Sequence, residues 1–171
     1  MSLKLKNLAA IFSAAAVVLA AALLLLPGPS RVTMPENGTG SFNQTAMLER
    51  GDIGMGFNQM AIHHHFAATP TGGEIIIMST NMSDTATIRE IRSHVRDIQR
   101  EFSEGNFTRP FYIHAEQVPG TDVMAAKKDL IRYSIRDIDG GSVLTLTTND
   151  TGLVAAIQQF MEFQSAQHMG H

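Results

Sequence analysis

The chain contains one segment twice, and this repeat limits the folds that it can adopt. Residues 63–81 align without a gap with residues 131–149, at a constant offset of 68. The alignment places Gly72-Gly73 on Gly140-Gly141 and Ser79-Thr80-Asn81 on Thr147-Thr148-Asn149. Each unit is interpreted as a strand, a Gly-Gly turn and a second strand, which is typical of a β-hairpin. The sequence therefore predicts the same hairpin twice.

A helix is predicted after each hairpin. The first covers about residues 85–104, with Ser83 or Asp84 as its N-cap, and the second covers residues 151–167. Apolar side chains recur at helical spacing in both segments. They are Ile88, Ile91, Val95, Ile98 and Phe102 in the first helix, and Val154, Ile157, Phe160 and Met161 in the second.

Two consecutive ββα units predict an α+β domain. Their hairpins can pair into a four-stranded antiparallel sheet with both helices on one face. We expect the domain to cover residues 55–171, with repeat one at 61–105 and repeat two at 130–168. The connection, residues 106–129, is expected to be extended at first and then helical. Residues 27–54, rich in Pro, Gly, Asn, Ser and Thr, are predicted to be a flexible linker.

The N-terminal segment indicates export. Residues 8–26, LAAIFSAAAVVLAAALLLL, are uncharged and apolar, and Lys4 and Lys6 precede them. Residues 1–26 are therefore predicted to be a signal peptide or an N-terminal membrane anchor. An uncleaved anchor is favoured, because the stretch is longer than most signal peptides need and no small-x-small cleavage site follows. The domain is expected in the periplasm or at the cell surface, with the N-terminus in the cytoplasm.

Strand alternation predicts which histidines of the run at 63–65 enter the core. In the second hairpin, Tyr133 belongs to the apolar set expected to face the helices. The repeat places His65 at the position of Tyr133. His65 is therefore predicted to point towards the helices, and His64 and Phe66 away from them. A register shifted by one residue would exchange the two sets.

A second histidine is predicted to face His65 from the first helix. His94 lies three residues after Ile91 and therefore shares its buried face. Its counterpart in the second helix is Phe160, as Tyr133 is the counterpart of His65. Two positions that are aromatic in repeat two are thus imidazoles in repeat one. This asymmetry is expected of a binding site built into one half of a duplicated fold.

These histidines predict a transition-metal site. We expect His65, His94 and His114 as ligands, with His64 near them and His63 or a methionine as a further ligand. The chain has no cysteine and ten methionines, so a soft-metal site must use histidine and methionine. Copper is favoured over zinc for an exported protein of this composition. An equally weighted hypothesis is that the buried histidines only form hydrogen bonds in a polar core.

Two other functions compete with metal handling or sensing. A histidine-dependent enzyme could use His65 or His94 as a general base, but no Ser-His-Asp spacing, P-loop, dinucleotide fingerprint or H-E-x-x-H motif occurs. A net charge of −3 without a basic run argues against nucleic acid, and a homodimer is left open. The tail at 168–171 is interpreted as a fraying end, with a low-affinity copper or nickel site as the less favoured alternative. A binding module would use the sheet face opposite the helices, with His64, Phe66, Arg132, Ser134 and Arg136.

Residues 55–168 also resemble a family of small, poorly characterised bacterial proteins. The resemblance is carried by Met55-Gly56-Phe57-Asn58-Gln59 followed by His64-His65-Phe66, and by the helix motif Arg92-x-His94. The family pattern is M-G-F-[DN]-Q leading into H-H-F, with an R-x-H motif on a helix. The resemblance implies that His64, His65, His94 and His114 belong to the motif, and it implies no particular activity.

Overall fold

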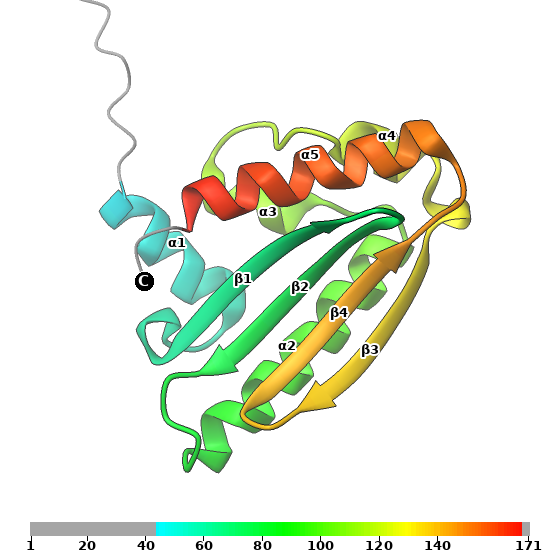
Figure 1. The fold of residues 1–171 in the computed structure, drawn as a ribbon. Helices are drawn as coiled ribbons and strands as arrows, with labels where there is room; N and C mark the ends of the chain where they lie inside the picture. The colour runs from blue at the N-terminus through cyan, green and yellow to red at the C-terminus, as the bar shows by residue number, and fades with distance from the viewer. Residues whose placement is uncertain (1–43, 169–171) are drawn as a thin grey trace, which may run out of the picture. The chain divides into compact units, whose positions relative to one another are not determined.

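The computed structural model describes residues 44–168, which form an α+β fold. Four strands make one antiparallel sheet in the order β1-β2-β4-β3 (Figure 1). This arrangement confirms the predicted α+β class and the four-stranded antiparallel sheet. The elements in chain order are α1 (Gln44–Met55), η1 (Gln59–Ala61), β1 (Ile62–Thr69), β2 (Gly72–Ser79), α2 (Thr85–Ser103), α3 (Thr108–His114), α4 (Thr121–Ala126), η2 (Lys128–Leu130), β3 (Arg132–Ile138), β4 (Gly141–Thr147) and α5 (Thr151–Gln167).

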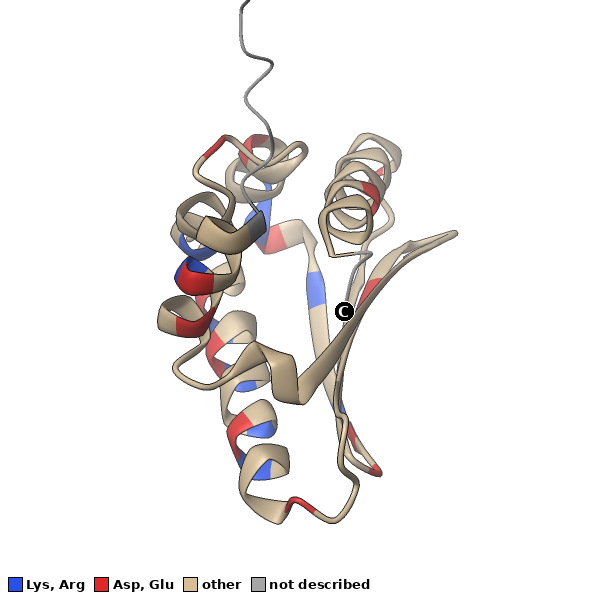
Figure 2. Ribbon diagram, turned by 90° about the vertical axis from the view of Figure 1, so that its left-hand side faces the viewer, with Lys and Arg blue, Asp and Glu red and all other residues tan. Residues whose placement is uncertain are grey.

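The two long helices divide one face of the sheet between them. Helix α5 packs on β1 and β2, and α2 packs on β4, β3 and β2. Figure 2 shows the helices on one side of the sheet and its other side uncovered by any described helix. The core lies between these layers because each helix places an apolar stripe on the apolar side of the sheet. Its largest fully buried side chains include Ile77, Ile91, Leu144, Leu146, Ile157 and Phe160.

The two hairpins are related by an offset of 69 residues and not 68. Thr69 pairs with Gly72 across the first turn, and Ile138 pairs with Gly141 across the second. Gly72 therefore corresponds to Gly141. A Cβ atom at Gly72 would collide with the carbonyl oxygen of Leu146, and one at Gly141 would collide with that of Ile77. These equivalent glycines allow β2 and β4 to approach each other, so they do not mark the turns that the sequence alignment assumed.

The one-residue shift exchanges the two faces of β1. Ile62, His64 and Phe66 are buried or half-buried on the helix side, whereas His63 and His65 are exposed on the other side. The prediction that His65 points inward and that His64 and Phe66 point outward is therefore wrong. The uncovered face presents His63 and His65 in place of His64 and Phe66.

The helix equivalence is confirmed by the caps. The side chain of Asp84 accepts a hydrogen bond from the backbone N–H of Thr87, three residues on, and Asp150 accepts one from Leu153 in the same way. His94 and Phe160 therefore occupy the same position in α2 and α5, as expected from the sequence.

Two segments differ from the predicted secondary structure. Residues 44–54, expected to be linker, form most of α1, where Met47 is fully buried. Residues 108–114, expected to be extended, form α3. Pro110 is the third residue of that helix, a position where a missing N–H leaves no hydrogen bond unmade. No described helix is long and apolar enough to span a membrane, and the anchor expected at residues 8–26 lies outside the described part.

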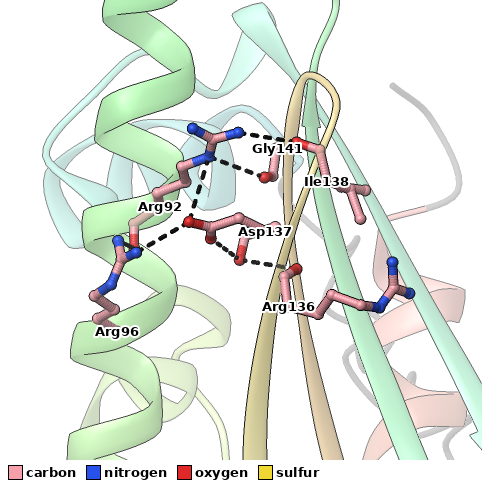
Figure 3. A network of polar contacts seen from close by, with 7 residues as sticks. Arg92, Arg96, Arg136, Asp137, Ile138 and Gly141 are labelled. Carbon is pink, nitrogen blue, oxygen red and sulfur yellow. Dashed lines mark hydrogen bonds and ion pairs between the residues drawn. The ribbon is translucent and has the colours of Figure 1, made fainter.

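Arg92 connects α2 to the turn of the second hairpin through hydrogen bonds (Figure 3). Its Nη2 donates to the carbonyl oxygen of Ile138 at 3.0 Å and its Nε to that of Gly141 at 3.3 Å. Asp137 lies between Arg92 and Arg96, with its Oδ2 atom 3.7 and 3.0 Å from their nitrogens. The guanidinium thus joins helix and hairpin through backbone atoms at the end of the sheet.

Replacing Arg92 with methionine is expected to lower the free energy of unfolding by about 1 to 2 kcal/mol, because two backbone carbonyls lose a charged donor. Urea denaturation of the full chain in detergent measures the change. Arg89→Met, an exposed arginine one turn earlier on the same helix, is the matched control and is expected to change the value by less than about 0.5 kcal/mol. Equal losses in both variants would contradict this role of Arg92.

Candidate functional site

A cavity of about 60 Å³ lies between the sheet and the helices. Elements far apart in the sequence contribute to its wall, from α1 through β1, β2, α2 and α3 to the end of α5. A mostly apolar cavity with a few converging polar groups has the form of a ligand site. Its polar lining residues are Gln59, His64, His94, Arg109, His114, Gln164 and His168, and its apolar ones include Met55, Phe66, Ile75, Ile77, Ile98, Phe102 and Phe160.

The structure brings together three of the four predicted metal ligands. His64, His94 and His114 all line the cavity. His65 does not line it, because its side chain is exposed on the opposite face of the sheet. His168, interpreted from sequence as part of a fraying tail, lines the cavity as well.

His64, His114 and His168 form a continuous histidine cluster. The ring centroid of His168 lies 5.2 Å from that of His64 and 5.5 Å from that of His114. Two phenylalanines pack around the cluster: Phe66 lies 5.4 Å from His168, and Phe163 lies 5.1 Å from His114. The cluster therefore joins strand β1, the end of α3 and the end of α5 in an aromatic environment.

The position of His168 follows from the periodicity of α5. Phe160, Gln164 and His168 are spaced four residues apart, so they share one face of the helix. Phe160 is 1% and Gln164 4% exposed, which shows that this face is the buried one. Extending the stripe by one turn reaches His168, whose backbone N–H closes the helix on the carbonyl oxygen of Gln164. This spacing is the sequence feature that could have identified His168.

Gln164 fixes the tautomer of His114. The Nε2 atom of His114 lies 3.0 Å from Oε1 of Gln164. An amide oxygen only accepts hydrogen bonds, so Nε2–H donates and Nδ1 carries the lone pair of the neutral ring. This Nδ1 atom is buried and has no hydrogen-bond partner within residues 44–168. Burial lowers the pKa of His114, and the hydrogen bond to Gln164 raises it by a smaller amount. The net lowering keeps the ring neutral at pH 7.

His94 is a second neutral imidazole in the cavity wall. Burial, assisted by the charge of Arg109, lowers its pKa from 6.5 to about 4, although Asp97 and Glu101 act in the opposite direction. Its ring meets that of Phe57 edge to face, with centroids 5.5 Å apart. No ring contact joins His94 to the histidine cluster among the described residues, so it forms a separate part of the wall.

Arg109 brings a positive charge to the cavity, and that charge is neutralised locally. Its Nε and Nη2 atoms donate to the two carboxylate oxygens of Glu101 at 3.0 and 2.6 Å, and Nη1 donates to the carbonyl oxygen of Gly54. Both side chains are about one quarter exposed or less. Each of the three guanidinium nitrogens donates a hydrogen bond, so Arg109 connects α1, α2 and α3, and its charge is paired with that of Glu101.

Within residues 44–168, no three histidine or carboxylate side chains already lie close enough together to hold a metal ion. The cluster rings pack against one another instead. With metal–nitrogen bonds near 2 Å, two imidazoles on one ion have ring centroids about 5 Å apart. The separations of 5.2 Å between His64 and His168 and of 5.5 Å between His168 and His114 are close to that value. His64 and His114 make no ring contact with each other among the described residues, so one ion bound by all three rings requires these two to move closer.

No protein-family model, curated protein or solved structure matches this chain. The resemblance to small bacterial proteins with the H-H-F and R-x-H motifs therefore stays a prediction.

Proposed function

We propose that this protein binds one transition-metal ion, copper in preference to zinc, through His64, His114 and His168. The observation that carries the proposal is the Nδ1 atom of His114, a buried lone pair without a hydrogen-bond partner in the described part of the chain. Buried polar atoms almost always have a partner. The atom belongs to a neutral ring in contact with a second histidine, which contacts a third. A metal ion held by the cluster supplies the missing partner.

The chemistry of the lining favours a soft, singly charged ion. Met55 lines the same cavity as the three cluster histidines, and no carboxylate does. Imidazole and thioether ligands suit Cu(I). An ion of charge +1 also costs less to bury among neutral ligands than Zn²⁺ does, because no anionic ligand compensates for the lost hydration. The ligand set expected from sequence is therefore revised. His65 and His94 are removed, His64 becomes a ligand, and His168 is added.

The proposed role is metal handling or sensing, without catalytic turnover. An extracytoplasmic location belongs to the same proposal and depends on the apolar segment at residues 8–26. His94 lines the cavity wall and is not one of the three proposed ligands.

Titration of the full chain in detergent tests the proposal. Under anaerobic conditions and against a competing chelator, we expect one equivalent of Cu(I) to bind with a dissociation constant below about 1 μM, and Zn²⁺ to bind more weakly. X-ray absorption of the copper-loaded protein should show nitrogen ligands near about 2 Å. Binding weaker than micromolar, or a preference for zinc, would overturn the proposal.

A further inference from the structure

We infer that the uncovered face of the sheet docks on an anionic lipid membrane, the membrane that holds the N-terminal segment. The inference rests on the location part of the proposed function, since it needs the apolar segment at residues 8–26 as an anchor. It does not depend on copper. It gives a partner to the side of the sheet that no described helix covers (Figure 2).

The strand register gives the composition of this face. Side chains that alternate with the buried ones of β2 and β4 point to the uncovered side. One row across the sheet, from β1 through β2 and β4 to β3, consists of His65, Ile76, Val143 and Arg136. Apolar side chains thus lie in the centre of the face, between an imidazole on one edge strand and a guanidinium on the other.

Two arginines on β3 give this face its positive charge. Arg132 and Arg136 are exposed, and they alternate with Tyr133 and Ile135, which pack against the core on the helix side. Figure 3 shows the side chain of Arg136 on the side of β3 away from α2. Neither guanidinium forms an ion pair within residues 44–168, where the ion pairs engage other basic side chains. Both charges are therefore available to an anionic partner.

Acidic side chains are scarce on the same face. In the described part of the chain, the register places one carboxylate there, that of Glu74 on β2. It is half-buried and accepts a hydrogen bond from Oγ1 of Thr145 at 3.2 Å. Asp137 of β3 lies on the helix side, where it pairs with Arg92 and Arg96. The face thus carries two cations against one anion, although the chain has a net charge of −3.

The chain that precedes α1 makes a membrane the anionic partner. Residues 27–43 connect the apolar segment to α1, which begins at Gln44, and they reach at most about 60 Å when fully extended. The sheet face is therefore held at a high effective concentration near lipid. Anionic headgroups strengthen docking about fivefold for each nearby arginine. The exposed imidazoles of His63 and His65 can donate hydrogen bonds to phosphate oxygens.

The absence of cysteine allows a test with single fluorescent labels on the full chain. Ser134→Cys places the label on the uncovered face, and Ser93→Cys places it on the exposed side of α2. Each labelled chain is reconstituted in nanodiscs that contain headgroup-nitroxide lipid, with or without phosphatidylglycerol in phosphatidylcholine. We expect the Ser134→Cys label to be quenched at least about threefold more with phosphatidylglycerol, and the Ser93→Cys label to show no such difference.

A charge-matched pair of variants locates the contact. Arg132→Gln/Arg136→Gln is expected to lower the ratio of docked to undocked protein about 25-fold, about fivefold for each arginine. Arg89→Gln/Arg100→Gln removes the same charge from exposed positions of α2 and should leave the quenching of the Ser134→Cys label unchanged. If circular dichroism shows that the first variant is unfolded, Arg136→Gln alone should give the fivefold loss.

Three results would overturn the inference. One is equal quenching in discs with and without phosphatidylglycerol, and another is equal loss in the two charge-matched variants. The third is the absence of quenching in any lipid, which is expected if the face binds an acidic protein instead.

Copper titration of the same nanodiscs separates this inference from the proposed metal site. Copper bound without lipid-dependent quenching overturns the inference alone, and quenching without bound copper overturns the metal site alone. A full chain that does not incorporate into nanodiscs overturns the anchor, and the inference with it.

Discussion

Replacing His64 with alanine is expected to weaken copper binding by at least about tenfold, whereas replacing its neighbour His65 should leave the affinity within about twofold. Loss of groups that merely support a ligand costs about 10- to 100-fold in metal affinity, so loss of a ligand should cost no less. The two substitutions remove the same side chain from adjacent positions of one strand. They differ only in the face of the sheet from which the imidazole is taken.

The expected difference follows from strand alternation. His64 shares the helix side of β1 with Ile62 and Phe66, and its ring stacks on that of Phe66 with centroids 5.9 Å apart. His65 is exposed on the uncovered side. A strand residue cannot reach the opposite face without a shift of register, which would move every side chain of β1.

Competition against a chelator measures both affinities, and the far-UV circular dichroism of each variant checks that the fold is kept. Equal losses in the two variants would mean that copper binds the surface histidines without selecting a face. A loss confined to His65→Ala would restore the ligand set expected from sequence and exclude the cluster.

The hairpins and the helices α2 and α5 could be predicted from the sequence because their patterns are local. The apolar spacing of α2 and α5 and the cap at Asp84 need no tertiary information. The faces of the first hairpin could not be predicted in the same way. Gly72 and Gly140 align in sequence, but Gly140 belongs to a turn and Gly72 lies against the carbonyl oxygen of Leu146 on the neighbouring strand. Glycine suits both a turn and a close approach of two strands. Only the pairing of the strands in the sheet shows which of the two a given glycine serves.

The site was predicted in part for a related reason. His94 was placed correctly because its spacing from Ile91 within one helix does not depend on the repeat. The face of His65 was transferred from the second hairpin through the repeat, and an error of one residue exchanges the faces of a strand. His168 was assigned to a fraying end in preference to a low-affinity metal site, although its spacing from Phe160 and Gln164 places it on the buried stripe.

The metal-free protein is expected to lose about 2 kcal/mol of unfolding free energy between pH 7 and pH 5 through His94, and His94→Phe should remove this loss. Burial lowers the pKa of His94 from 6.5 to about 4 in the folded state. As the pH falls through about 6.5, His94 takes up a proton in the unfolded chain. In the folded chain His94 stays neutral until the pH falls to about 4. The unfolded state therefore binds more protons in this window, and stability decreases as the pH decreases.

Phenylalanine is the informative replacement because Phe160 occupies the equivalent position of α5, where it is 1% exposed. Urea denaturation of the chelator-treated full chain at pH 7, 6 and 5 measures the slope. Burial also lowers the pKa of His114, so a smaller slope of the same sign should persist in His94→Phe. His65→Phe makes the same substitution at an exposed site and should keep the full slope. An unchanged slope in His94→Phe would show that this imidazole takes up its proton in the folded protein as readily as in the unfolded chain, contrary to its burial beside Arg109.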